Sequence, residues 1–306
     1  MLTDDDLYRH GTQFRVWSFA GADLVARREA INARGITKLR RTHSSEVLAN
    51  VEFLTAAEEL DLVVYYCYKA QDLAAVFKFP TVVKATAISY LKKFYLRFSV
   101  MDYHPKDVMY TCLFLSSKAE NHFISIEKFV EPLQKVTSAA LIDLEYVVIQ
   151  ALSFTLLVHH PFDPIHGFFL DMQSAFAADK VADLGALHDA ARRHANNALF
   201  SDASFLYSPP HIALAAMALA NQDLVTDYIR IKFKSSPQIE SQIITEIDLI
   251  KPLILAGANQ PSRDRMIAID KKLYYCRNPE KLTKRKVVSA EVDSRSDDQK
   301  RIKIET

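Results

Sequence analysis

The sequence predicts an all-α protein, and three observations carry this prediction. Its 306 residues include only six glycines, fewer than the turns of a β-rich or Rossmann-type fold require. Hydrophobic residues make up 49% and charged residues 25%, the balance of a globular chain with a buried core. From Phe53 onward, apolar residues recur at helical spacing and no segment alternates as a half-buried strand does. The length predicts two domains of ordinary size.

A first helical set is expected within residues 51–158. Thr55 is a suitable N-cap for its first helix, with Glu58 at the capping-box position three residues later. Pro80 and Pro105 open the next two helices, because proline is favoured in a first turn. The helix after Pro105 is small or apolar on most faces, so we expect it to be central. The remaining helices of this set are expected at residues 125–130 and 138–152.

A similar arrangement follows in residues 159–256. Its first helix opens at Pro161, and Pro210 lies in the first turn of a helix that is almost entirely small or apolar. That second central helix begins about 105 residues after Pro105, so we expect a tandem repeat of architecture. Further helices are expected at residues 186–202, 223–233 and 238–255.

The ends of the chain lie outside the two sets. Residues 1–50 contain the only tryptophan, Trp17, and are expected to dock on the core as an irregular segment followed by a charged helix at 22–34. One more helix is expected within residues 257–278. Residues 279–306 are charged and poor in aromatics, which predicts disorder. A basic cluster in this tail is either a nuclear-targeting signal or a solvated stretch; its members are Lys281, Lys284, Arg285 and Lys286.

Composition argues against several classes of protein. The net charge of +1 does not favour direct nucleic-acid binding. The three cysteines are far apart and odd in number, which indicates neither a disulfide framework nor a zinc site, and we expect no cofactor or metal. No apolar run reaches the roughly 18 residues of a membrane helix, and no signal peptide is visible at the N-terminus.

The sequence also offers no recognisable catalytic motif. GxSxG, HExxH, P-loop and GxGxxG patterns are all absent, so we predict a protein that is not an enzyme. One charged pair is of interest: Lys118 ends the third helix and Glu145 lies within the fifth, where the two could bridge the helices. From the residues alone a solvated pair worth about 0–1 kcal/mol is the simpler interpretation.

Several segments of the first set resemble the cyclin family. TAISYLKKFYLRF (86–98), FLSSKAEN (114–121) and LEYVVIQALSFTLLVHHP (144–161) are similar to the second helix, the end of the third helix, and the fifth helix with its linker. Together these motifs are specific, and the resemblance covers most of residues 50–255. It implies two tandem five-helix cyclin folds with additional N- and C-terminal helices. One departure is Asn121, which stands where many cyclins carry a second glutamate.

Other segments are similar to the cyclin H subfamily: YRHGTQFRVWSF (8–19), SVMDYHPKDVM (99–109) and FLYSPPHIAL (205–214). This resemblance implies a nuclear regulatory subunit of a cyclin-dependent kinase, the CDK-activating kinase. It further implies a RING-containing assembly factor as partner, and a general transcription factor that contains the complex. Expected substrates of the kinase are the activation loops of other cyclin-dependent kinases and the C-terminal domain of RNA polymerase II.

The same resemblance assigns a kinase-binding surface to the third and fifth helices. Lys118, Glu120 and Glu145 match the polar contacts to the kinase. The apolar contacts would be Ile149, Phe154 and Leu156, although the last two are equally compatible with core positions. Two alternatives remain: a cyclin of the C or T subfamily, and a transcription-factor-B-like double cyclin fold that binds promoter DNA. The second normally has a zinc ribbon and basic repeats, which this chain lacks.

Overall fold

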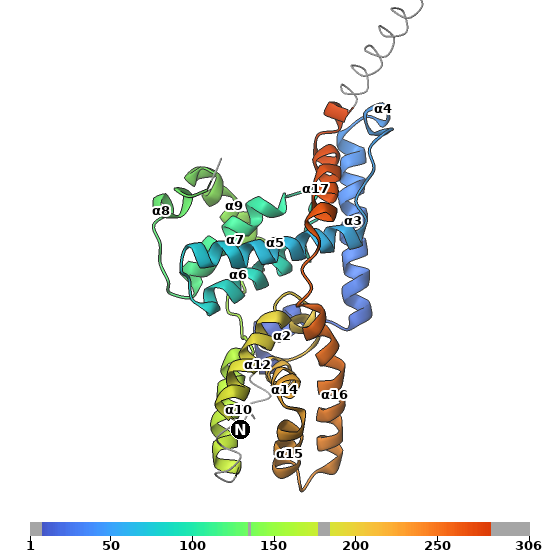
Figure 1. Ribbon diagram of the computed structural model, residues 1–306. Helices are drawn as coiled ribbons and strands as arrows, with labels where there is room; N and C mark the ends of the chain where they lie inside the picture. The colour runs from blue at the N-terminus through green and yellow to red at the C-terminus, as the bar shows by residue number, and fades with distance from the viewer. Residues whose placement is uncertain (1–7, 134–135, 177–183, 283–306) are drawn as a thin grey trace, which may run out of the picture.

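Two helical sets are stacked along the long axis of the molecule (Figure 1). The computed structural model describes residues 8–133, 136–176 and 184–282, and every regular element in these ranges is a helix. The all-α prediction is confirmed. None of the helices in the described ranges is long and apolar enough to span a membrane.

The first set consists of α5 (Ala56–Val76), α6 (Thr81–Phe94), α7 (Pro105–Ala119), α8 (Ile126–Val130) and α9 (Ser138–Ala151). The predicted capping box is present: the Thr55 hydroxyl accepts from the Glu58 amide at 3.2 Å, and the Glu58 carboxylate accepts from the Thr55 amide at 2.8 Å. Pro80 is the N-cap of α6 and Pro105 opens α7. As predicted, α7 is central, because it packs against α5, α6 and α9.

The second set consists of α10 (Phe162–Ala175), α12 (Leu184–Ala198), α13 (Ala203–Leu206), α14 (Pro209–Ala220), α15 (Gln222–Lys232) and α16 (Pro237–Ala256). The apolar helix α14 is its centre and contacts α10, α12, α15 and α16. The helix expected at 186–202 ends earlier, at Ala198. Tighter bonds to the third residue back, such as Leu199 N–H to Asn196 O, turn the chain there into the short α13.

Helices that flank the two sets among the described residues include α2 (Thr12–Trp17), α3 (Gly21–Thr42), α4 (Ser45–Leu48) and α17 (Arg263–Arg277). Part of the segment expected to be irregular is therefore helical. Helix α3 extends well beyond the predicted 22–34, passing Ser99 so closely that a Cβ on Gly35 would lie 2.8 Å from the Ser99 Cβ. Helix α17 packs on α5, where Lys272 pairs with Glu58 at 3.0 Å. Most of the tail predicted to be disordered lies outside the described residues.

The junction of the two sets is tightly packed. The rings of Tyr68 on α5 and Phe200 after α12 are stacked, with centroids 4.0 Å apart, and the Tyr68 hydroxyl donates to the Gly257 carbonyl at 2.5 Å. Lys84 on α6 donates to the side chain of Asn196 on α12. One cluster of buried apolar side chains runs through both sets, so they form a single packed unit.

Three helices of the first set end at residues with positive φ that are not glycine. After α5, α7 and α9 these residues are Lys78, Asn121 and Ser153, with φ of 56°, 58° and 54°. In each case the next amide bonds a carbonyl five residues back, as in a Schellman motif. After α9 a second residue, Phe154, also has positive φ, at 58°. This double turn sets the direction of the segment that links the two sets.

Candidate functional site

Lys118 and Glu145 form an ion pair between two helices. Lys118 lies in the last turn of α7 and its Nζ contacts Glu145 Oε1 in the middle of α9. The Lys118 side chain remains 37% exposed, whereas that of Glu145 is 13% exposed. The ammonium group also lies 4.7 Å from the centroid of the Phe114 ring. The pair therefore presents a cation to solvent above a carboxylate that is largely enclosed.

Glu120 points in another direction. It caps the C-terminus of α7, and its carboxylate accepts a hydrogen bond from the Thr86 hydroxyl at 2.6 Å. Because the Thr86 proton is donated there, His160 Nε2, 2.8 Å from the same hydroxyl oxygen, must be the donor in that contact. Burial, followed by the charge of Lys93, lowers the pKa of His160 to about 3, so its ring is neutral at pH 7.

Asn121, the departure from the cyclin motif, occupies one of the left-handed positions described above. A short polar side chain such as Asn adopts positive φ at lower cost than most residues. The turn it makes is closed by the His122 amide, which donates to the Ser117 carbonyl at 2.7 Å. The substitution is thus explained by the way in which α7 ends.

The three apolar residues assigned to the surface differ in exposure. Phe154 is 72% exposed, which rules out the core position that the sequence left open. Ile149 and Leu156 are half-buried and pack against the main core. Leu156 is held further by its carbonyl, which accepts from the Tyr90 hydroxyl at 2.5 Å.

Additional exposed apolar side chains lie on the same elements and were missed from the sequence. Tyr146 is 69% and Ile142 43% exposed on α9, and Leu157 is 66% exposed in the linker. Phe123, just after α7, is 76% exposed. The signal for α9 was present, because Ile142, Glu145, Tyr146 and Ile149 follow the i, i+3, i+4, i+7 spacing of one helix face. This face is distinct from the core stripe of α9.

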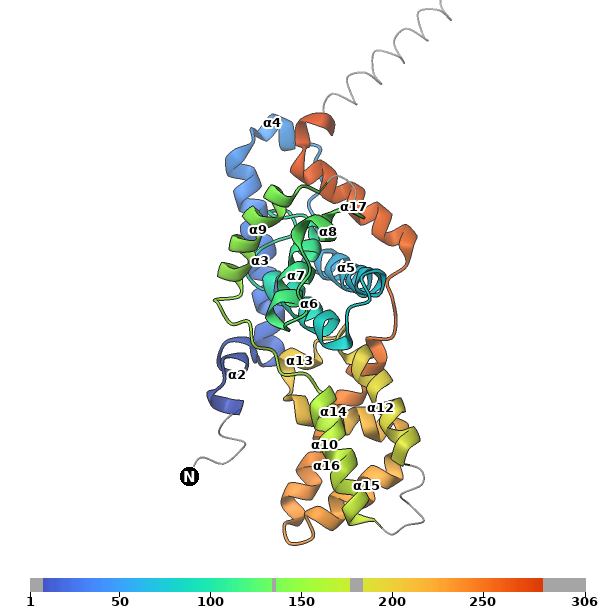
Figure 2. The same ribbon diagram turned by 90° about the vertical axis from the view of Figure 1, so that its left-hand side faces the viewer.

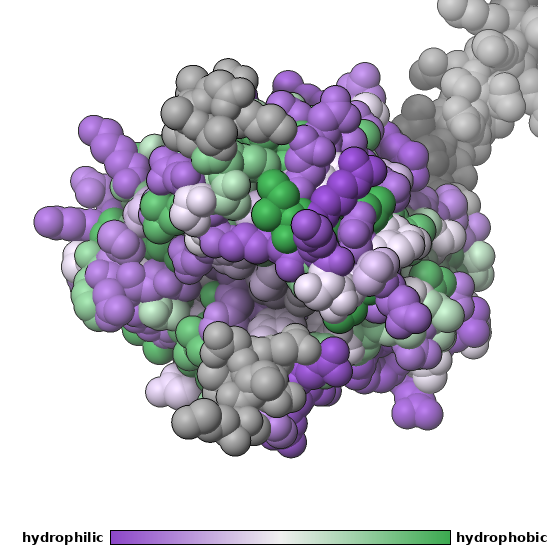
Figure 3. Space-filling view, turned by 90° about the horizontal axis from the view of Figure 1, so that it is seen from below, coloured by the Kyte–Doolittle hydropathy of each residue, from purple (hydrophilic) through white to green (hydrophobic). Residues whose placement is uncertain are grey.

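We refer to the ion pair Lys118–Glu145 together with the apolar residues just described as the α7–α9 surface; its apolar members are Phe123, Ile142, Tyr146, Ile149, Phe154, Leu156 and Leu157. Figure 2 shows α8 and α9 on the side of the first set that faces the viewer, with the linker descending past α2 to α10. The end of the second set is different in character: in Figure 3 hydrophilic side chains dominate and hydrophobic ones form small separate groups. Exposed apolar groups that share their elements with charged ones are typical of a protein–protein interface, which combines an apolar core with a polar rim.

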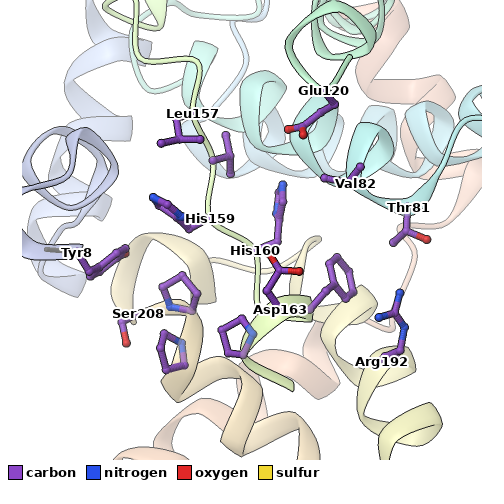
Figure 4. A pocket seen from close by; sticks show the side chains of 15 residues that line it. Tyr8, Thr81, Val82, Glu120, Leu157, His159, His160, Asp163, Arg192 and Ser208 are labelled. Atoms are coloured by element: carbon purple, nitrogen blue, oxygen red, sulfur yellow. The ribbon is translucent and has the colours of Figure 1, made fainter. Parts of the chain in front are cut away.

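A groove of about 840 Å³ lies between the two sets, beside this surface. Figure 4 shows Glu120 and Val82 on its upper side, and Asp163, Arg192 and Ser208 on its lower side, with His160 between. Both walls mix charged and apolar groups. Within the described ranges, no three histidine, cysteine or acidic side chains lie close enough to hold a metal ion.

Family models match both halves of the chain. A cyclin N-terminal domain model matches residues 70–157, and a cyclin C-terminal domain model matches residues 160–255. A curated relative from Schizosaccharomyces pombe, cyclin mcs2, is 33% identical over 90% of this chain and 86% of its own length. The chain belongs to the cyclin family.

Other relatives of this cyclin carry related names. Cyclin CCL1 of Saccharomyces cerevisiae is 38% identical over 76% of the chain, which spans 63% of that relative. Cyclin-H of Xenopus laevis is 30% identical over 90% of the chain and 88% of the relative. The resemblance to the cyclin H subfamily is therefore confirmed.

Two solved assemblies contain chains similar to this cyclin. One is the CAK complex of Chaetomium thermophilum bound to ATP-γ-S, with a TM-score of 0.83 and 27% identity over 95% of this chain and 96% of the other. The second is the yeast TFIIK complex of Kin28, Ccl1 and Tfb3, with a TM-score of 0.68 and 34% identity over 81% of this chain and 100% of the other. The two family models confirm the predicted tandem cyclin fold, and the likeness to the Chaetomium thermophilum chain extends over 95% of this chain.

Proposed function

We propose that this cyclin is the regulatory subunit of a CDK-activating kinase. The observation that carries the proposal is the likeness, along 95% of the chain, to a chain of a CAK complex. The chain itself would carry no catalytic residues and would act on the kinase. Support also comes from the 34% identity to a chain of the yeast TFIIK complex.

The α7–α9 surface is the proposed kinase-binding site. Lys118 offers exposed N–H donors, and Glu145 fixes their position through the ion pair. Tyr146, Phe154 and Leu157 offer apolar area that the isolated chain leaves in water. Aromatic anchors beside a few desolvated charges are the usual source of affinity in such interfaces. Glu120, which accepts a hydrogen bond from Thr86, would contribute at the edge of this surface, beside the groove between the two helical sets.

Activation follows from differential binding. Phosphoryl transfer requires the helix αC of a kinase to be placed inward, so that its glutamate pairs with the lysine that holds ATP. A subunit that binds the inward form more tightly shifts the population toward it. Raising the active fraction from 1% to 99% takes about 5.5 kcal/mol of differential affinity. A few well-packed anchors supply free energy of this size.

The wider partners are proposed on the same ground. The yeast complex contains a third protein, Tfb3, besides Kin28 and Ccl1. By analogy we assign to this cyclin an assembly factor with a RING domain and a place in a general transcription factor in the nucleus. The kinase would then phosphorylate activation loops of other cyclin-dependent kinases and the C-terminal domain of RNA polymerase II.

The test is affinity capture with the tagged chain as bait, followed by mass spectrometry of the captured kinase. The parent chain is expected to capture a cyclin-dependent kinase, and Glu145→Lys to capture at least about tenfold less, because reversal places two cations against the kinase. Asp143→Lys is the matched control, an exposed acid on the same helix that lies off this face, and it should capture normally.

A charge swap separates a kinase contact from an internal strut. The double variant Lys118→Glu with Glu145→Lys rebuilds the ion pair in reverse. If the pair only ties α7 to α9, the swap restores capture, whereas a contact with the kinase stays broken. Absence of a cyclin-dependent kinase from the parent capture would refute the function, and full capture by the Glu145→Lys bait would refute the site.

A further inference from the structure

The short helix α2 is attached to the linker between the two cyclin repeats. Gln13 on α2 is 6% exposed and pairs with both backbone groups of one linker residue. Its Nε2 donates to the His159 carbonyl at 3.2 Å, and its Oε1 accepts from the His159 amide at 2.6 Å. The Gln13 amide thus satisfies both backbone hydrogen-bonding groups of His159, as a neighbouring β-strand would do for an extended segment.

Trp17 makes a second attachment four residues further along α2. It is 1% exposed, and its indole Nε1 donates to the Thr155 hydroxyl at 2.7 Å. The ring also contacts two cations of the first repeat, with Lys93 Nζ 5.6 Å and Arg97 Cζ 5.4 Å from its centroid. Arg97 in turn donates to the Ser153 hydroxyl at 3.1 Å. The indole therefore links α2 to both the linker and α6.

The cation–π contact with the Trp17 ring stands in place of a hydrogen bond at the Lys93 ammonium group. The residue is 2% exposed, and its Nζ has no hydrogen-bond partner among the described residues. Burial, with a smaller effect from Lys92, lowers the pKa of Lys93 to about 7. A buried cation of this kind gains from the face of an indole, which no other residue in the chain provides.

The linker held in this way is the segment that presents part of the α7–α9 surface. Between the two attachments, at Thr155 and His159, lie Leu156 and the exposed Leu157, and just before them lies the exposed Phe154. The linker, residues 152–161, has no helix or strand of its own, and Ser153 and Phe154 near its start adopt positive φ. A conformation of that kind persists when neighbouring groups fix it.

We propose that α2 is a brace whose residues Gln13 and Trp17 are positioning residues for the kinase-binding surface. They fix the linker so that Phe154 and Leu157 are already in place when the kinase arrives, which lowers the ordering cost of binding. The brace acts through the linker and does not itself touch the kinase. This inference rests on the proposed function of the α7–α9 surface.

The attachment is tested first in the free chain, where no kinase is needed. In Gln13→Met the bonds to His159 are lost while the shape is kept, and the amides of residues 155–159 are expected to exchange with deuterium at least about tenfold faster. Thr155→Val, which removes the acceptor for Trp17, should do the same. Arg15→Met, an exposed position on the same helix, is the control and should leave these amides unchanged. Unchanged linker exchange in both brace variants would overturn the proposal.

The second test is a double-mutant cycle on kinase affinity. Gln13→Met is expected to weaken binding roughly 3- to 10-fold in the parent, and by a clearly smaller factor when Phe154 and Leu157 are already alanine, because the brace works through those side chains. An equal factor in both backgrounds would mean that α2 touches the kinase directly, and no loss of affinity would mean that the brace has no role in binding; either result overturns the inference. If the parent chain binds no kinase, the proposed function fails with it, and the parent measurement alone reveals this.

Discussion

Phe154 combines two features that are unfavourable in the isolated chain. Its backbone has a φ of 58°, and its side chain is 72% exposed. The left-handed conformation costs a residue with a Cβ about 1–2 kcal/mol. Burial in this chain does not offset that cost, so the residue is better explained by what it would contact in a complex.

Replacing Phe154 by glycine should therefore stabilise the free chain and weaken kinase binding. Phe154→Gly should raise the free energy of unfolding by about 0.5–1 kcal/mol, because glycine adopts positive φ without strain. The same change should weaken kinase binding about tenfold or more, as expected for loss of an aromatic anchor. Urea unfolding and a kinase titration measure the two quantities. Phe154→Ala is the control, with weaker binding and no gain in stability; a less stable glycine variant would contradict the account.

At the level of residues, some contacts across the fold could be anticipated and others could not. The sequence allowed Lys118 and Glu145 to bridge their two helices, and they form an ion pair. The inward turn of Glu120 onto Thr86 was not foreseen, since it depends on how α6 packs against the end of α7. The bond between Thr86 and His160 also joins residues 74 positions apart, and no local pattern signals it.

Helix starts were predicted well because their signals are local. Thr55 with Glu58, Pro80 and Pro105 each act within one turn of the chain. The ends of α7 and α9 were predicted to within one residue, although the left-handed residues that follow them are not glycine. The end of α5, before the left-handed Lys78, was not predicted, because no glycine marks it.

Two other elements show where local reasoning fails. Helix α2 has six residues, too few to be stable alone, and it is helical because Gln13 and Trp17 dock. Helix α9 carries apolar residues on two faces, and spacing alone does not say which face is buried. Tertiary neighbours decide it: Val148 is fully buried and Tyr146 is mostly exposed.

At the scale of the whole molecule, a close backbone approach inside the second repeat lies where that repeat meets the first. Gly257 ends α16 against the last turn of α12, and a Cβ at this position would lie 2.1 Å from the Asn197 carbonyl oxygen. The backbone there has an ordinary helical φ of −67°, so the glycine is required by space and not by conformation. Tyr68 of the first repeat bonds to the same residue.

A pair of glycine substitutions tests this packing. Gly257→Ala is expected to lower the free energy of unfolding by about 1–3 kcal/mol, because a backbone atom must move to admit the methyl group. Gly167→Ala, in α10 with nothing within 4 Å of the added Cβ, should raise it by about 0.5–1 kcal/mol. Thermal unfolding of the two variants should therefore shift in opposite directions. Shifts of the same sign would show that α16 and α12 pack less closely here than described.

A hydrogen–deuterium exchange footprint of the chain, with and without its cyclin-dependent kinase, locates the bound surface directly. Kinase binding should slow exchange in residues 118–123 and 142–157, which carry the α7–α9 surface, and should leave exchange in α15 and α16 unchanged. Slower exchange confined to the second repeat or to α17, with residues 142–157 unaffected, would contradict the proposed kinase-binding site.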